Sequence, residues 1–135
     1  GYYDALRVIY GLEGKIYYVE QTQKECYYLR QLVQIRPEVM QGLLEAYELS
    51  TEPEQQLRNY LEVLLPLLAA RLKLPKDWSY SSLYLAILES AARLLKVPRY
   101  RIYTVQELLE AVKDRFGKKE DTEEFPEYMQ IVLDT

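Results

Sequence analysis

The chain contains no histidine and a single cysteine, Cys26, among its 135 residues. Without histidine it lacks the commonest general base, the Ser-His and Cys-His nucleophile pairs and the commonest metal ligand. One cysteine forms neither an internal disulfide nor a thiolate metal site, and it fits a reducing, cytoplasmic setting. We therefore expect a protein that is not an enzyme and that uses no cofactor and no metal.

Glycine is also scarce, and the five glycines, at 1, 11, 14, 42 and 117, form no phosphate-binding loop. The sequence has no uncharged apolar run of about 18 residues and no basic-then-apolar start, so we expect no membrane span and no signal peptide. Glu107, Glu110 and Asp114 share one helical face that could hold Mg²⁺, but a solvated acidic face is the commoner use of such a pattern.

The residues that the chain does contain predict helices. Apolar residues make up 49% of the chain, and no segment shows the strict alternation of apolar and polar residues that is typical of a half-buried strand. Ile16 to Val19 has strand-like residues, but the helical period that follows places it in a helix. We expect one all-α domain over 1–135, a bundle of five to seven mostly antiparallel helices. The expected helices cover about 3–10, 15–35, 37–49, a segment that starts at Thr51 and runs to Leu72, 80–96, 104–117 and a short segment from Pro126.

Helix starts are marked by short polar residues. Thr51 with Glu54, and Thr104 with Glu107, have the spacing of a capping box, in which each side chain bonds the other residue's backbone N–H. Asp77 or Ser79 can cap the helix over 80–96. The run from Leu83 to Leu88 in that helix is apolar on all sides, which predicts a central, buried helix.

Two further features predict where helices bend or stop. Pro66 interrupts a stripe made by Leu57, Leu61, Leu64, Leu68 and Leu72, so we expect a kink near 62–66 or two short helices. Gly117 can take the left-handed conformation that ends many helices. Cys26, on the apolar side of its helix, is expected to be a small buried hydrophobe.

Tyrosine is unusually abundant: fourteen tyrosines accompany two phenylalanines and one tryptophan. Three doublets occur, Tyr2-Tyr3, Tyr17-Tyr18 and Tyr27-Tyr28. Neighbours on a helix point about 100° apart, so at most one of each pair can face the core squarely. The tyrosines therefore line either the edge of the core or an interface, where a large ring with a polar tip binds well.

The net charge of −4 conceals an asymmetry along the chain. Residues 71–101 contain seven basic and two acidic residues, which is a net charge of +5, whereas 102–135 carry −5 and 1–70 carry −4. A basic belt on an otherwise acidic protein can face an anion while the remainder keeps the protein soluble.

The basic belt is our candidate for binding a nucleic-acid backbone. It interleaves cations with tyrosines, and Tyr100 or Tyr103 could stack on a base. The alternative is that these cations only complement helix dipoles at C-terminal ends. Nothing in the belt reads base sequence. The candidate nucleic-acid-binding residues are Arg71, Lys73, Lys76, Arg93, Lys96, Arg99, Tyr100 and Arg101.

In its length, its helical pattern, its many tyrosines and its basic 93–101 segment beside an acidic remainder, the chain resembles the small helical subunit of CRISPR effector complexes. That subunit corresponds in some subtypes to the C-terminal part of the large subunit. The resemblance covers the whole chain at the level of architecture, and the net charge of −4 departs from it. It implies a non-catalytic ribonucleoprotein subunit for antiviral defence, present in several copies beside other subunits and holding DNA or the guide–target duplex.

The sequence thus leaves two functions open. The first is a subunit of a multi-subunit complex that holds DNA or RNA by its backbone. The second is a helical adaptor that binds only protein partners or copies of itself, with the tyrosines as its contact surface. Because residue 1 is Gly rather than Met, the chain is expected to be trimmed, to carry a tag remnant, or to be a piece of a longer protein. The apolar and aromatic residues over 2–10 favour a piece.

Overall fold

The computed structural model describes residue 2 and residues 17–20, 23–119 and 125–135. Over these residues the chain forms an all-α helical bundle with one two-stranded parallel sheet, which confirms the predicted fold class. None of the described helices combines the length and the apolar character needed to cross a membrane. The predicted helix over 3–10 lies outside the described residues.

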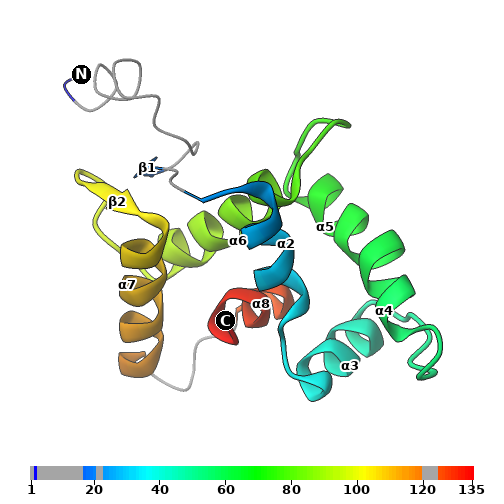
Figure 1. Ribbon diagram of the computed structural model, residues 1–135. Coiled ribbons are helices and arrows are strands. Elements are labelled where there is room, and N and C mark those ends of the chain that lie inside the picture. The colour runs from blue at the N-terminus through cyan, green and yellow to red at the C-terminus, as the bar shows by residue number, and fades with distance from the viewer. Residues whose placement is uncertain (1, 3–16, 21–22, 120–124) are drawn as a thin grey trace.

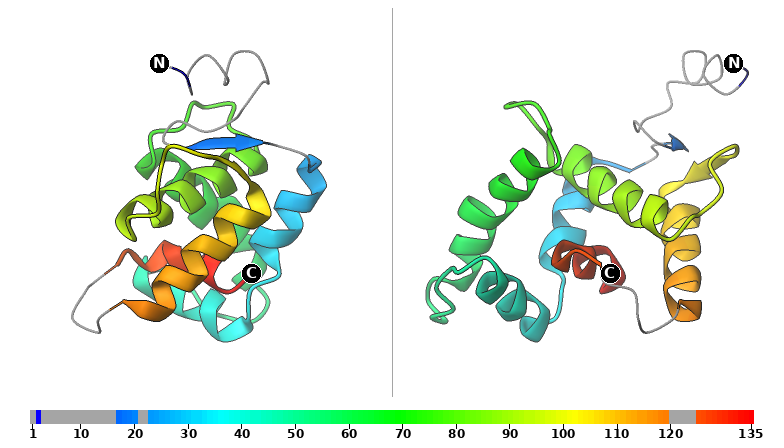
Figure 2. Two further views of the ribbon diagram at one scale, coloured as in Figure 1. Left: turned by 90° about the vertical axis from the view of Figure 1, so that its left-hand side faces the viewer. Right: turned by 180° about the vertical axis from the view of Figure 1, so that it is seen from behind.

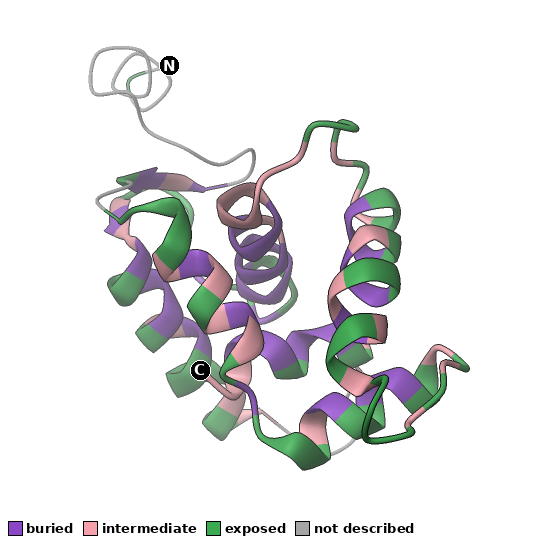
Figure 3. Ribbon diagram, turned by 45° about the vertical axis from the view of Figure 1, so that its right-hand side comes forward, coloured by how far each residue is buried: buried purple, intermediate pink, exposed green. Residues whose placement is uncertain are grey.

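Helix α6 (Tyr80–Leu94) forms the centre of the bundle. It contacts α2 (Glu25–Val33), α7 (Val105–Lys118) and α8 (Gln130–Leu133). Between 83 and 92 every residue except Ala86 is buried, as the apolar run predicted (Figure 3). The helix begins at a capping box between Ser79 and Ser82, so the prediction of Ser79 as a cap is also confirmed.

The remaining helices pack on both sides of this centre. On one side lie α3 (Pro37–Ala46), α4 (Gln56–Asn59), the π-helical turn η1 (Tyr60–Leu64) and α5 (Leu65–Arg71). Helix α7 lies on the other side, with α2, α6 and α8 between them (Figures 1 and 2). The 3-10 turn η2 (Glu127–Met129) contacts both α3 and α6, so the C-terminal segment closes the bundle.

The predicted helix over 15–35 is wrong in its first part. Strand β1 (Tyr18–Glu20) pairs in parallel with β2 (Ile102–Thr104), and α2 begins only at Glu25. Val19 lies opposite Tyr103, and both are buried. The pairing joins segments far apart in the sequence, so the helical period after residue 20 gave no sign of it.

The interruption predicted at Pro66 is present as a π-helical turn. The N–H of Leu65 donates to the carbonyl of Tyr60, five residues back, and α5 starts there. Proline has no N–H for the usual bond to a carbonyl four residues back, so the hydrogen-bond pattern changes at this point. The predicted stripe is buried at Leu64 and Leu68, but Leu57 is 53% exposed.

Three smaller predictions are wrong. Thr51 and Glu54 form no capping box, because a turn over 52–55 delays the helix start to Gln56. Gly117 is not a left-handed cap: α7 continues through it to Lys118, with Phe116 packed against Phe125 at a ring distance of 6.2 Å. Cys26 is exposed, because it lies in the first turn of a helix that begins later than predicted.

The tyrosines mostly belong to the core. Tyr17 and Tyr28 are buried while their neighbours Tyr18 and Tyr27 are half-buried, as the doublet argument predicted. Of the described tyrosines only Tyr2 and Tyr100 are exposed. Several buried hydroxyls bond backbone carbonyls: Tyr17 to Val97 at 2.7 Å, Tyr60 to Leu32 at 2.6 Å and Tyr103 to Pro98 at 2.6 Å.

Candidate nucleic-acid interface

Two segments of the basic belt share one backbone design. Both α5 and α6 have a leucine as their C-cap residue, Leu72 and Leu95, and the lysine that follows each leucine has a positive φ of 61°. These lysines are Lys73 and Lys96. The residue after each lysine donates its N–H to a carbonyl five residues back, which closes the helix end as in a Schellman motif. Arg71 and Lys73, and likewise Arg93 and Lys96, thus lie at the negative ends of two helix dipoles.

The structure brings Arg71, Lys73 and Arg93 together around one pocket of about 300 Å³. One face of α6 forms part of its wall, including Glu89. That carboxylate is 4% exposed and accepts a hydrogen bond from the backbone N–H of Tyr17 at 2.7 Å. The pocket therefore combines three cations with one carboxylate that is already hydrogen-bonded.

Arg71 is also engaged with a ring. Its guanidinium donates to the hydroxyl of Tyr47 at 3.1 Å and lies 5.9 Å from the centroid of that ring. Burial raises the pKa of Tyr47, while the nearby Arg71 lowers it. The contact fixes Arg71 without neutralising its charge, because the phenol stays protonated at neutral pH.

Lys76 lies apart from that group. It lines a different pocket with Glu25, Trp78, Ser79 and Tyr80, at the start of α6. The carboxylate of Glu25 accepts hydrogen bonds from the backbone N–H groups of Tyr80 and Ser81. Lys76 therefore faces a site that already contains an acidic group.

The loop after α6 carries Arg99, Tyr100 and Arg101. Tyr100 is 74% exposed, and Arg99 is exposed as well. Arg101 pairs with Glu107 at 3.0 Å and lies 4.8 Å from the centroid of the Tyr103 ring. Arg101 is therefore the belt residue whose charge is balanced by a neighbouring carboxylate.

Lys96 joins a second basic group that the sequence did not single out. A pocket of about 440 Å³ lies between the end of α6 and the end of α7. Four of its seven described lining residues are basic, and the acidic one, Asp114, pairs with Lys118 at 3.1 Å. The basic lining residues are Lys96, Arg115, Lys118 and Lys119.

Arg99 and Arg115 both act electrostatically on the buried Tyr17. Burial and the neighbouring Tyr103 raise the pKa of Tyr17 to about 12, and the positive charges of Arg99 and Arg115 act in the opposite direction. Both guanidinium groups therefore lie within electrostatic range of the Tyr17 phenol. The loop after α6 and the last turns of α7 therefore each contribute a positive charge that acts on Tyr17.

Arg115, Lys118 and Lys119 were not predicted as binding residues. The segment 102–135 that contains them has a net negative charge, because its acidic residues outnumber its basic ones. The signal was the local run Lys113-Asp114-Arg115-Phe116-Gly117-Lys118-Lys119 at the end of an amphipathic helix. Basic residues in the last turn of a helix are common as caps, so the run alone does not indicate binding. Its proximity to Lys96 depends on the fold.

The acidic face considered for Mg²⁺ is used differently. Glu107 accepts hydrogen bonds from the backbone N–H of Thr104 and from Arg101, and these bonds lower the pKa of its carboxyl group. Over residue 2 and residues 17–20, 23–119 and 125–135, no group of three or more acidic or cysteine side chains could hold a metal ion.

No protein-family model, curated protein or solved structure matches this chain.

Proposed function

We propose that this protein binds the sugar–phosphate backbone of a nucleic acid, without catalysis, as a subunit of a larger complex. The observation that carries the proposal is the pocket between the ends of α6 and α7, where Lys96, Arg115, Lys118 and Lys119 accompany a single carboxylate. Phosphates that enter such a site release counterions, which is the main source of sequence-independent affinity.

The other belt residues extend this surface. The exposed ring of Tyr100 lies in the same loop as Arg99, where a base can stack while the guanidinium binds the adjacent phosphate. Arg71, Lys73 and Arg93 offer a second group of cations around their own pocket. Contacts of this kind position a strand but do not read its sequence, so we expect binding to be non-specific.

The test is fluorescence anisotropy with labelled strands of about 30 nucleotides, single and duplex, at about 50 and about 200 mM salt. We compare the Lys96→Glu, Lys118→Glu double variant with a Lys24→Glu, Arg30→Glu control. The control makes the same change of net charge on α2, away from both basic pockets. The pocket variant should bind at least about tenfold more weakly, and its log–log salt slope should fall by about 1.4.

Equal weakening in the pocket variant and the control would mean that only net charge matters, and the assigned site would be wrong. A third variant, Arg71→Glu with Arg93→Glu, asks whether the second basic group lies on the same path. An effect on long strands but not on strands of about 8 nucleotides would place it as a distal contact.

A helical adaptor that binds only protein is the second candidate, and one observation favours it. Leu57, Val63 and Leu67 on α4, η1 and α5 are 53%, 41% and 40% exposed. Large apolar side chains gathered on one exposed segment are typical of protein-binding surfaces. An adaptor should show no salt-dependent binding to either strand, whereas Leu67→Ser should weaken its assembly into the larger complex.

If the chain is a CRISPR-effector subunit, as its resemblance implies, the cationic pocket and the exposed apolar residues of α4, η1 and α5 act together. The cationic pocket holds DNA or RNA, while the apolar face of α4 and α5 contacts other subunits or further copies of this chain. This assignment predicts that nucleic-acid affinity rises when the chain is part of an assembly, because each copy adds phosphate contacts.

A further inference from the structure

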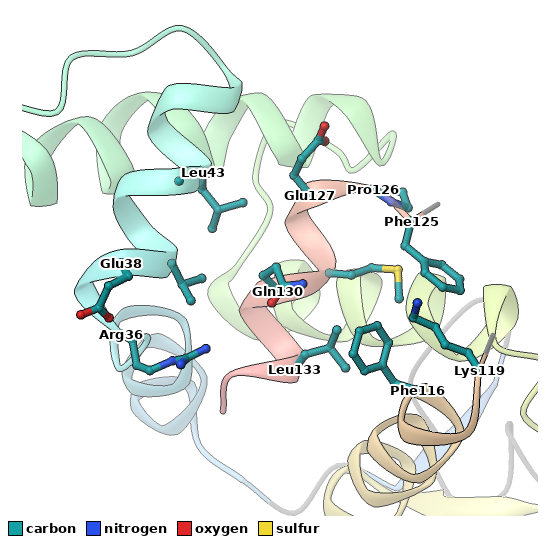
Figure 4. Close-up of a pocket in the computed structure, with 13 residues that line it drawn as sticks. Arg36, Glu38, Leu43, Phe116, Lys119, Phe125, Pro126, Glu127, Gln130 and Leu133 are labelled. Atoms are coloured by element: carbon teal, nitrogen blue, oxygen red, sulfur yellow. The ribbon is translucent and has the colours of Figure 1, made fainter. Parts of the chain in front are cut away.

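A further pocket has a mainly apolar lining and shares one residue, Lys119, with the α6–α7 pocket. It has a volume of about 540 Å³ and lies between α3, the end of α7 and the C-terminal segment (Figure 4). Its apolar residues include Val39, Leu43, Phe116, Phe125, Met129 and Leu133. This volume is in the range of sites that hold small organic molecules, about 300–1,000 Å³.

The basic and acidic side chains around this pocket point in different directions. In Figure 4 the Arg36 guanidinium and the Lys119 ammonium point toward the apolar lining, while the carboxylates of Glu38 and Glu127 point away from it. Lys119 Nζ lies 5.0 Å and 5.2 Å from the centroids of the Phe116 and Phe125 rings. Arg36 pairs with Asp134 through Nε, at 2.6 Å, so its two Nη groups remain able to donate.

A glycine in the middle of α3 forms part of the pocket wall. A Cβ added at Gly42 would meet no atom within 4 Å, so no neighbouring side chain requires a glycine there. Glycine inside a helix destabilises it by about 0.5–1 kcal/mol relative to alanine. Its presence keeps this wall open at the backbone, as in sites where a ligand approaches the main chain closely.

We propose that this pocket binds a small amphipathic acid, a molecule with an apolar body and one anionic group. The body contacts Phe116, Phe125, Met129 and the facing side chains of α3, and the anion lies between Arg36 and Lys119. The two sites share Lys119, whereas Lys96, Arg115 and Lys118 line only the α6–α7 pocket and Arg36 lines only the apolar pocket. This site is therefore additional to the nucleic-acid function.

Decanoate is the probe, and decanol is the matched neutral molecule. The two methionines of the chain give an internal control in methyl NMR, because Met129 lines the pocket whereas Met40, buried on α3, does not. Decanoate should shift the Met129 methyl signal in a saturable way below about 1 mM and leave Met40 nearly unchanged. No saturable shift of Met129, or equal shifts of both methionines, would overturn the proposal.

Variants at Gly42 test the pocket itself. Gly42→Phe places a ring in the open space and should weaken decanoate binding at least about tenfold, whereas Gly42→Ala should bind within about twofold of wild type. Lys119→Gln should weaken decanoate about two- to fivefold and leave decanol unchanged. Circular dichroism checks that each variant is folded, and unaltered binding by folded Gly42→Phe contradicts the assignment. Oligonucleotide binding by Gly42→Phe should stay at the wild-type level, so failure of this proposal is distinguishable from failure of the first.

Discussion

Among the residues that the structure describes, three other than glycine adopt the left-handed backbone conformation: Glu48, Lys73 and Lys96, with φ of 57°, 61° and 61°. Each follows the end of a helix, and the next residue donates its N–H to the carbonyl five positions back. These bonds are Leu49 to Leu44 at 2.8 Å, Leu74 to Ala69 at 2.9 Å and Val97 to Ala92 at 2.9 Å. The helix ends are therefore built with side chains at positions where glycine is less strained.

Replacing Glu48 with glycine should stabilise the protein. The left-handed conformation costs an L residue roughly 1–2 kcal/mol, and the greater freedom of glycine in the unfolded chain offsets about 0.5–1 kcal/mol of the gain. We expect Glu48→Gly to raise the free energy of unfolding by about 0.5–1 kcal/mol in urea denaturation, and Glu48→Ala not to do so.

Gly117 supplies the reverse exchange as a control. It lies inside α7 with no atom within 4 Å of an added Cβ, so Gly117→Ala should also stabilise, by about 0.5–1 kcal/mol. A loss of stability in Gly117→Ala would instead support the left-handed cap that the sequence predicted. The presence of a glycine alone thus led to a wrong prediction of the cap. The backbone conformation of Gly117 depends on where the last turn of α7 packs.

At the scale of elements, two identical sequence signatures have different outcomes. Thr104 accepts from the N–H of Glu107 at 3.1 Å, and Glu107 accepts from the N–H of Thr104 at 2.9 Å, which is a complete capping box. Thr51 has the same spacing to Glu54, but there the carbonyl of Thr51 accepts from the side chain of Gln56 at 2.8 Å. The Thr-x-x-Glu spacing therefore permits a capping box, but the box forms only where a helix begins directly after the threonine.

Alanine substitutions of these two threonines should separate the cases. Thr104→Ala removes the acceptor for a helix N–H and should cost about 0.5–2 kcal/mol of unfolding free energy. Thr51→Ala should cost less than about 0.5 kcal/mol, because its side chain caps no helix. Thermal and urea unfolding of both variants measure the difference. Equal costs would contradict the assignment of the α7 cap.

Several elements could be predicted from the sequence because their signals are local. The buried character of α6, the Ser79 cap and the interruption near Pro66 all follow from residues within a few positions. Strand β1 could not be predicted in this way, because three residues become a strand only where β2 supplies hydrogen-bonding partners. The two-stranded sheet is thus a consequence of how the helices pack.

At the scale of the whole molecule, the candidate site shows that the net charge of a sequence segment does not reveal where its cations lie in the fold. The sequence placed the cations in one belt along the chain. The fold instead divides them between two basic pockets, a third pocket that contains Lys76, and the loop after α6, and it adds Arg115, Lys118 and Lys119 to Lys96. The net charge of one segment does not show which charged residues another helix places next to it, as α7 does for Lys96 at the end of α6. Local runs of charge at helix ends are the better guide.

The buried tyrosines also make the whole molecule sensitive to alkaline pH. Burial raises the pKa of Tyr17 and of Tyr84 to about 12, and burial raises the pKa of Tyr60 as well. An unfolded chain ionises these phenols near pH 10, so above that pH the unfolded state binds fewer protons than the folded state. The stability they contribute is complete below about pH 10 and is lost as the pH rises toward their folded pKa values.

Comparison of Tyr84→Phe with wild type isolates one of these phenols. At pH 9 the variant should be less stable by about 1 kcal/mol, because the hydrogen bond between the Tyr84 hydroxyl and Thr135 Oγ1, at 3.1 Å, is lost. Between pH 10 and 11 the wild type should lose up to about 1.4 kcal/mol more than the variant, which has no phenol to ionise at this position. Urea unfolding at pH 9, 10 and 11 measures both curves. Parallel curves over this range would mean that Tyr84 titrates alike in the folded and unfolded chain, and the burial argument would fail for this residue.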